Sequence, residues 1–183
     1  MSSIAKIRLA HALKNLMQTK PLDKITIDEL TQLADLNRNT FYYHFADIYD
    51  LLDWTFEQDI IIQVKRNLTA KNWPSKYQIT LDYISTNRHF CLESLHSQRR
   101  DLLENFLFEL GTQMVKSVVL DIDDQINPHL SCDLINFYGG AIASQVLQWL
   151  LDDLKTPKNV LISRATAILD GTIEFVIHKN THK

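Results

Sequence analysis

The sequence has little glycine and little proline, with four of each in 183 residues. Both residues mark turns and interrupt helices, so their scarcity disfavours a chain of many short strands joined by tight turns. Regular alternation of apolar and polar residues is also rare, and long segments are rich in helix-favouring residues. At 45% hydrophobic and 22% charged residues, the chain is too apolar to be disordered. We therefore predict an all-α fold without a sheet.

Cysteine and long apolar runs are scarce as well. Cys91 and Cys132 lie far apart, lack a C-x-x-C spacing and have apolar neighbours, which predicts two reduced core residues. No segment approaches the roughly 18 apolar residues of a membrane-spanning helix. Residues 4–17 mix charged with apolar residues, unlike a signal peptide. These absences predict a cytoplasmic protein with no membrane partner.

Signatures of catalysis are missing too. The sequence has no Gly-rich phosphate loop, nucleophile elbow or Cys/His zinc spacing. His89, Glu93 and His96 share one face of a predicted helix, and that geometry could hold a metal. A solvated polar face explains such a stripe more often. We predict that the chain is not an enzyme and has no cofactor or metal.

Two short helices are predicted between residues 26 and 45. Thr26 and Glu29 have the spacing of a capping box, so one helix should begin near residue 27 and end near residue 34. Asn37 then caps a second helix, in which Phe41 and Phe45 stand four residues apart and can face inward together. Two capped helices separated by a three-residue turn form a helix-turn-helix.

The other residues of the second helix are polar or amphipathic. Arg and Asn offer donors for base edges, while Thr and Tyr hydroxyls can bond phosphate oxygens. A pair of ordinary amphipathic helices with surface aromatics is the alternative, but adjacent exposed tyrosines need a reason on a protein surface. The residues concerned are Arg38, Asn39, Thr40, Tyr42, Tyr43 and His44.

The chain resembles a TetR-family transcriptional regulator. IRLAHALKNLMQ resembles the first helix of that family, ITIDELTQLADLNRNTFYYHF its helix-turn-helix and ADIYDLL the start of its fourth helix. The most specific part is TFYYHF, followed closely by an acidic residue and Leu. Carried over by position, the resemblance implies DNA contacts by Thr26, Arg38, Asn39, Thr40, Tyr42, Tyr43 and His44.

The sequence departs from the family pattern at two positions. Asp35 stands where the family usually has Gly in the turn, and Asp adopts a left-handed backbone less easily than Gly. Ile48 stands where the family usually has a phosphate-contacting Lys. The second departure removes one expected phosphate contact and predicts a lower affinity for DNA.

Charge supports this interpretation only weakly. The net charge is −3, whereas a dedicated nucleic-acid-binding domain is often basic. Residues 1–22 contain four basic residues and no acid, yet residues 1–50 as a whole balance six Lys and Arg against six Asp and Glu. We expect a modest dependence of DNA binding on salt.

The rest of the chain is predicted to form a larger helical body. We therefore predict a DNA-binding domain at 1–50 and a regulatory and dimerisation domain at 51–183. One helix of about 20 residues is expected from residue 46 or 47, broken by the Asn-Trp-Pro-Ser segment at 72–75. Further helices are expected at 76–86, 88–97, 99–121, 129–153 and 157–178.

Small residues in the last two predicted helices suggest close helix packing. Glycine inside a helix costs about 1 kcal/mol relative to Ala, and a close approach between helices could offset that cost. A four-helix interface between two copies would explain the pattern, and the family resemblance implies such a homodimer; a monomer that buries both helices is the alternative. The predicted interface residues are Gly139, Gly140, Ala143, Leu147, Ala165, Ile168 and Leu169.

These observations predict a dimeric transcriptional regulator, of the repressor type, that binds a pseudo-palindromic DNA site. Arg38, Asn39 and Tyr43 are the predicted base readers, and the other four residues would hold phosphates. The resemblance also implies a small-molecule effector in the body, with pocket residues unknown. As an alternative, FYGGAIASQVLQWLLDD resembles the regulatory domains of the dihydroxyacetone-kinase activator group, and such a body could respond to a protein co-regulator. Repression is the expectation, although no residue of the sequence distinguishes it from activation.

Overall fold

The computed structural model describes residues 2–169 and 171–181. Every regular element in that part of the chain is helical and none is a strand, which confirms the all-α prediction. None of the helices described there is both long and apolar enough to cross a bilayer. Contacts within the chain define two compact units, residues 1–59 with 87–106 and residues 60–86 with 107–183. The functional division at residue 50 stays a prediction.

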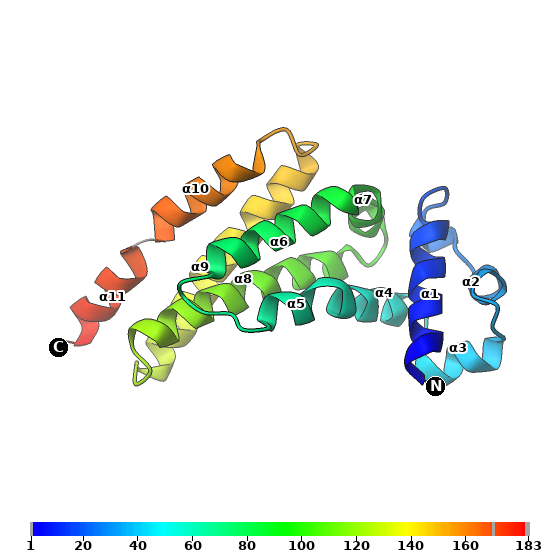
Figure 1. Ribbon diagram of the computed structural model, residues 1–183, viewed down its shortest axis with the longest axis horizontal. Helices are drawn as coiled ribbons and strands as arrows, with labels where there is room; N and C mark the ends of the chain where they lie inside the picture. The colour runs from blue at the N-terminus through cyan, green and yellow to red at the C-terminus, as the bar shows by residue number, and fades with distance from the viewer. Residues whose placement is uncertain (1, 170, 182–183) are drawn as a thin grey trace. The chain divides into compact units, whose positions relative to one another are not determined.

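The first unit holds the helix-turn-helix. α2 and α3 pack against α1, and α4 follows them in the chain (Figure 1). Phe56 at the end of α4 packs between two aromatic rings, with centroids 4.5 Å from Phe106 and 5.2 Å from Phe90. The helices of this unit are α1 (Ser2–Leu16), α2 (Ile27–Leu33), α3 (Arg38–His44), α4 (Ile48–Phe56), α7 (Arg88–His96) and the first residues of α8 (Arg100–Ile122).

The two cysteines differ in their surroundings. Cys91 is buried in the first unit, and burial raises the pKa of its thiol to about 12. Cys132 is exposed on α9 (Pro128–Leu151), so the prediction that both are core residues is wrong for Cys132. Its apolar sequence neighbours belong to the buried face of an amphipathic helix, while Cys132 itself lies on the other face.

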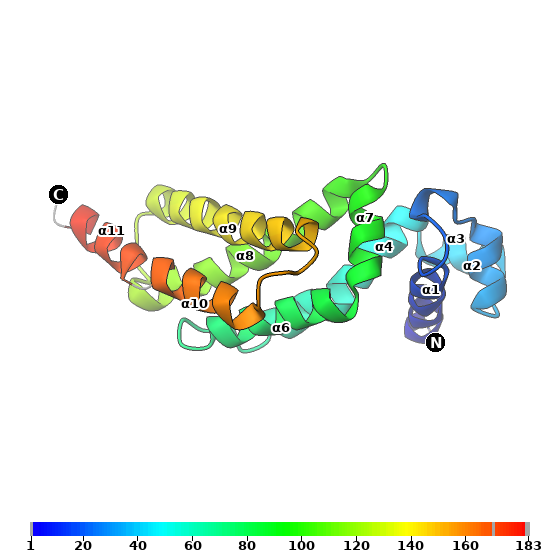
Figure 2. The ribbon, with the colours of Figure 1, turned by 90° about the horizontal axis from the view of Figure 1, so that it is seen from above.

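The second unit is built around long helices. α9 runs alongside α8 (Figures 1 and 2), and α10 packs on α6. The buried Tyr77 hydroxyl donates a hydrogen bond of 2.6 Å to Gln145, which joins α6 to α9. Besides α8 and α9, its helices are α5 (Ile62–Lys65), α6 (Trp73–Thr86), α10 (Lys158–Leu169) and α11 (Thr172–Thr181).

Three predicted helices need correction. The helix that begins at Ile48 is not uniform, because a π-helical segment, Glu57–Ile61, interrupts it before α5. The predicted break at 72–75 instead starts α6, since proline is tolerated in the first turn of a helix. The single helix expected at 157–178 is divided into α10 and α11, and Gly171 between them has φ +75°, a left-handed conformation that ends helices.

Glycine also sets the spacing between α8 and α9. A Cβ on Gly139 would lie 2.8 Å from the Cα and the backbone N of Thr112, and Gly111 faces the Gly139 backbone. A methyl group there would overlap backbone atoms. The helix-breaking cost of Gly139 is therefore offset by close packing within one chain. Gly140 differs, because its Cβ would meet only the Phe108 ring at 3.6 Å.

We predict different effects for alanine at these adjacent glycines. Gly139→Ala should lower the free energy of unfolding by about 1–3 kcal/mol, because α8 and α9 must separate. Gly140→Ala should leave it unchanged or raise it by up to about 1 kcal/mol, because alanine is the better helix former. Urea unfolding followed by circular dichroism measures both. Equal effects of the two substitutions would contradict the close approach at Gly139.

Candidate nucleic-acid interface

The start of α2 is fixed by the predicted capping box. The Thr26 hydroxyl accepts a hydrogen bond from the Glu29 amide at 3.3 Å, and the Glu29 carboxylate accepts from the Thr26 amide at 2.9 Å. Lys20 donates to the same carboxylate at 2.6 Å. The hydrogen bond from Lys20, followed by those from Thr26, lowers the pKa of Glu29 to about 2. Thr26 is exposed and already bonded through its hydroxyl.

The turn between α2 and α3 depends on a left-handed residue. Asp35 has φ +54°, so Asp adopts here the conformation for which the family usually has Gly. The chain reverses at this point, and the Leu36 amide donates to the Thr31 carbonyl at 2.9 Å. Asn37 then caps α3, because its Oδ1 accepts from the Thr40 amide at 2.8 Å and from the Thr40 hydroxyl at 3.1 Å. The predicted caps of both helices are confirmed.

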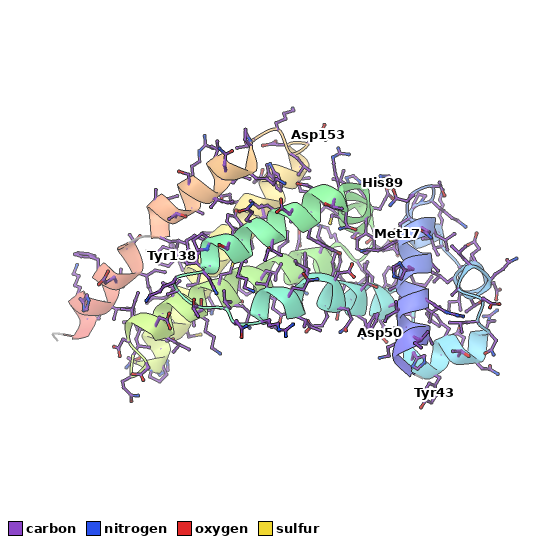
Figure 3. All side chains as sticks on the ribbon, in the orientation of Figure 1. Met17, Tyr43, Asp50, His89, Tyr138 and Asp153 are labelled. Carbon is purple, nitrogen blue, oxygen red and sulfur yellow. The ribbon has the colours of Figure 1, made fainter. Side chains whose placement is uncertain are left out.

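Two phenylalanines fix the orientation of α3. Phe41 and Phe45 are buried, with ring centroids 5.9 Å apart, as predicted from their spacing. The opposite side of the helix therefore faces solvent. Tyr43 is the most exposed of its aromatic residues, at 82%, and it points away from the protein (Figure 3). The predicted DNA-contacting residues of α3 are exposed or half-buried: Arg38, Asn39, Thr40, Tyr42, Tyr43 and His44.

Arg38 is paired with an acid of α2. Its Nη1 lies 3.1 Å from the Asp28 carboxylate. The Tyr42 hydroxyl, one turn along α3, and the charge of Asp28 raise the pKa of Arg38. Sequence reasoning did not single out Asp28. In the sequence, Asp28 is an acid in the first turn of a helix, where the helix dipole commonly favours acids.

Most basic groups of residues 1–50 interact with other groups of the first unit. Four are paired with carboxylates: Arg8 with Asp35, Lys14 with Asp59, Lys20 with Glu29 and Arg38 with Asp28. Lys6 lies over the rings of Phe45 and Trp54, at 5.3 and 5.5 Å from their centroids. Carboxylates of the protein itself therefore offset four of the six Lys and Arg charges in residues 1–50.

The start of α4 is acidic. The Asp47 carboxylate accepts from the Asp50 amide at 2.9 Å, and the Asp50 carboxylate accepts from the Ala46 amide at 2.9 Å. Ile48, at the position of the family's phosphate-contacting Lys, is half-buried and is the first residue of the helix. This end of α4 offers carboxylates where the family pattern would offer a cation.

The residues predicted for a dimer interface take different positions in the second unit. Ile168 is 60% exposed, whereas Gly140 and Leu147 are half-buried. The remaining four are buried within the chain: Gly139, Ala143, Ala165 and Leu169. An exposed stripe of α9 follows Phe137, Ala141, Ser144, Gln148 and Leu151.

A small apolar groove lies between α9 and α10. It has a volume of about 60 Å³ and is lined mainly by Tyr138, Ala141, Ile142 and Ile168. Elsewhere in the described part of the chain, no three His, Cys, Asp or Glu residues come together in a way that could hold a metal. His89 and His96 are exposed on α7 and Glu93 is half-buried.

Comparisons with known proteins identify the family. A family model described as a transcriptional regulator C-terminal region, of the TetR type, matches residues 71–171, more than half of the chain. The chain belongs to the TetR family of transcriptional regulators. This is a family of regulators and not of enzymes.

Two further similarities agree with this assignment. The chain is 26% identical over 130 residues to the HTH-type dhaKLM operon transcriptional activator DhaS of Lactococcus lactis subsp. lactis (strain IL1403), which covers 71% of this chain and 68% of that protein. A solved structure of a dihydroxyacetone kinase operon activator DhaS superposes with a TM-score of 0.73 at 20% identity, over 93% of this chain and 97% of that chain. It shows the same fold.

The capping box at α2 predicts a defined acid sensitivity. The pKa of Glu29 is lowered from 4.5 to about 2, so its stabilising effect is complete above pH 4.5 and is lost as the pH falls from there towards 2. Glu29→Gln should be less stable than wild type at pH 7 and should lose less stability between pH 4.5 and 2. Thermal unfolding across this pH range measures the difference.

Asp133→Asn is the control, because Asp133 is an exposed acid of α9 outside the helix-turn-helix. It should follow the wild-type pH profile. A Glu29→Gln profile parallel to wild type would show that the capping carboxylate does not carry the effect.

Proposed function

We propose that this TetR-family regulator binds double-stranded DNA sequence-specifically through α3. The observation that carries the proposal is the exposed side of α3, where polar and tyrosine side chains are held on a helix anchored by buried Phe41 and Phe45. A helix of this kind fits the major groove, and its side chains reach base edges and phosphates.

We assign roles by chemistry and position. Arg38 and Asn39, at the start of α3, carry donors that suit guanine and adenine edges, and the exposed Tyr43 is the third base reader. The four proposed phosphate contacts are Thr26, Thr40, Tyr42 and His44. The proposed DNA-binding part is residues 1–50, and residues 51–183 would respond to an effector and form a homodimer in the cytoplasm.

Effector control and its direction belong to the same proposal. Family membership alone supports an effector that binds the second unit, because the apolar groove between α9 and α10, at about 60 Å³, is much smaller than the roughly 300 Å³ of a small ligand pocket. The relative from Lactococcus lactis is named an activator, which favours activation over the repression expected from the sequence.

Selection of bound duplexes from a random DNA library tests sequence-specific binding. We expect a pseudo-palindromic site, because two copies related by a two-fold axis present two α3 helices. Its affinity should fall only modestly between about 50 and 200 mM salt, because few cations are available for phosphates. No enrichment at the lower salt concentration would contradict the proposal.

Two substitutions then separate base reading from phosphate binding on the selected duplex. Asn39→Ala should cost about 1–3 kcal/mol on the selected duplex and little on a scrambled one, because its amide reads a base. Tyr42→Phe should weaken binding to both duplexes by the same factor. Fluorescence anisotropy with both duplexes measures the four affinities, and a uniform effect of Asn39→Ala would move Asn39 to the phosphate contacts.

The homodimer is supported by apolar groups left exposed on the second unit. Phe137 and Phe175 are 74% and 65% exposed, and Ile168 and Leu151 are exposed as well. Exposed apolar groups of this size on neighbouring helices are typical of interaction surfaces. We propose that a second copy covers them.

A charge placed on this surface should prevent the homodimer. Ile168→Glu is expected to shift the protein from dimer to monomer in sedimentation velocity, because the carboxylate would have to be desolvated. Ile62→Glu, at another exposed isoleucine outside this surface, should leave the dimer unchanged. A dimer that persists in Ile168→Glu would place the interface elsewhere.

A second candidate function is a helical regulator that acts on transcription only with a protein partner. The pairing of most basic groups of residues 1–50 with acids favours this candidate, since few cations remain for phosphates. In that case the selection experiment would succeed only after a co-regulator is added.

A further inference from the structure

The pairing of Arg38 with Asp28 links the two helices of the helix-turn-helix. Asp28 lies in the first turn of α2, and Arg38 is the first residue of α3. The Arg38 Nη1 is 3.1 Å from the Asp28 carboxylate. A long, flexible side chain of α3 is thus held against α2.

This ion pair has little value for folding. The side chains of Asp28 and Arg38 are 68% and 56% exposed, and exposed ion pairs contribute little to stability. The alternative role of the ion pair is to orient the Arg38 guanidinium and to offset its charge. Arginine loses much rotamer freedom when it binds, so a guanidinium held in advance loses less.

The pair also changes what Arg38 can bind. A guanidinium has five N–H donors in a fixed fork, so a carboxylate can occupy part of the fork while other donors remain for guanine O6 and N7. A phosphate is different, because its attraction to Arg38 is opposed by the adjacent Asp28 charge. The pair therefore favours a directional base contact over an undirected phosphate contact.

We propose that Asp28 is a specificity-determining positioning residue, which holds Arg38 for a guanine edge and suppresses its binding to phosphates. This inference rests on the proposed function, in which α3 contacts DNA. Asp28 acts through Arg38 and needs no contact with DNA of its own. Its removal should raise affinity for DNA in general while lowering discrimination between sequences.

Asp28→Asn tests the proposal, with Asp35→Asn as the matched control. Both substitutions remove one negative charge from an exposed side chain of the helix-turn-helix. Asp35 is 4.0 Å from Arg8 and is not the partner of Arg38, and Asn accepts the φ of +54° found there. Affinities are measured for the selected and the scrambled duplex over a series of salt concentrations.

We expect Asp28→Asn to tighten binding to the scrambled duplex and to lower the ratio of the two affinities by about fivefold to a hundredfold. The decrease of affinity with salt should become steeper by up to about one released counterion per protein copy, because Arg38 becomes free to bind a phosphate. Asp35→Asn should change both affinities by the same factor. Repeated library selection with Asp28→Asn should show a weaker preference for guanine at one position in each half-site.

Arg38→Ala completes the test. It should remove the same base preference, and adding Asp28→Asn to it should change the affinity ratio no further. An Asp28→Asn protein with the wild-type preference and affinity ratio would overturn the role of Asp28. A wild-type protein that enriches no sequence would instead overturn the proposed function, and the role of Asp28 with it.

Discussion

The inward packing of Phe41 and Phe45 decides which residues of α3 the protein can offer to a ligand. Both rings are buried against the first unit, so rotation of the short helix about its axis would expose large apolar surface and is strongly disfavoured. Asn37 and Asp35 fix where the helix begins, the first as a cap and the second through its left-handed turn. These local constraints determine which side chains of α3 face solvent.

Electrostatics then sets what kind of binding this arrangement supports. Attraction of phosphates by unpaired Lys and Arg supplies most sequence-independent affinity for DNA. Here those charges are largely offset by carboxylates on the same unit, and acidic caps occupy the start of α4. A protein built in this way depends on directional contacts by α3, or on a partner, to a greater degree than a strongly basic regulator does.

The parts of the fold that sequence predicted are those determined locally. The capping box at Thr26, the cap at Asn37 and the burial of Phe41 and Phe45 each depend on residues within one helical turn. The break at Gly171 was missed because a glycine inside a helix and a glycine that ends one look alike in sequence. The pairing of Asp28 with Arg38 depends on the angle between two helices, and spacing alone does not give that angle.

The same distinction explains how glycine in α9 should be interpreted. Glycine in a helix indicates a close approach, but it does not say whether the neighbour belongs to the same chain. Gly139 approaches Thr112 of α8 within one chain, so the small residues of α9 cannot by themselves argue for a dimer. Phe137 and Leu151 support a dimer better, because they lie on a different face of α9 and remain exposed. A helix that already buries one face and still presents large apolar groups on another has a second surface to cover. In a two-fold dimer, this patch on one copy packs against the same patch on the other copy.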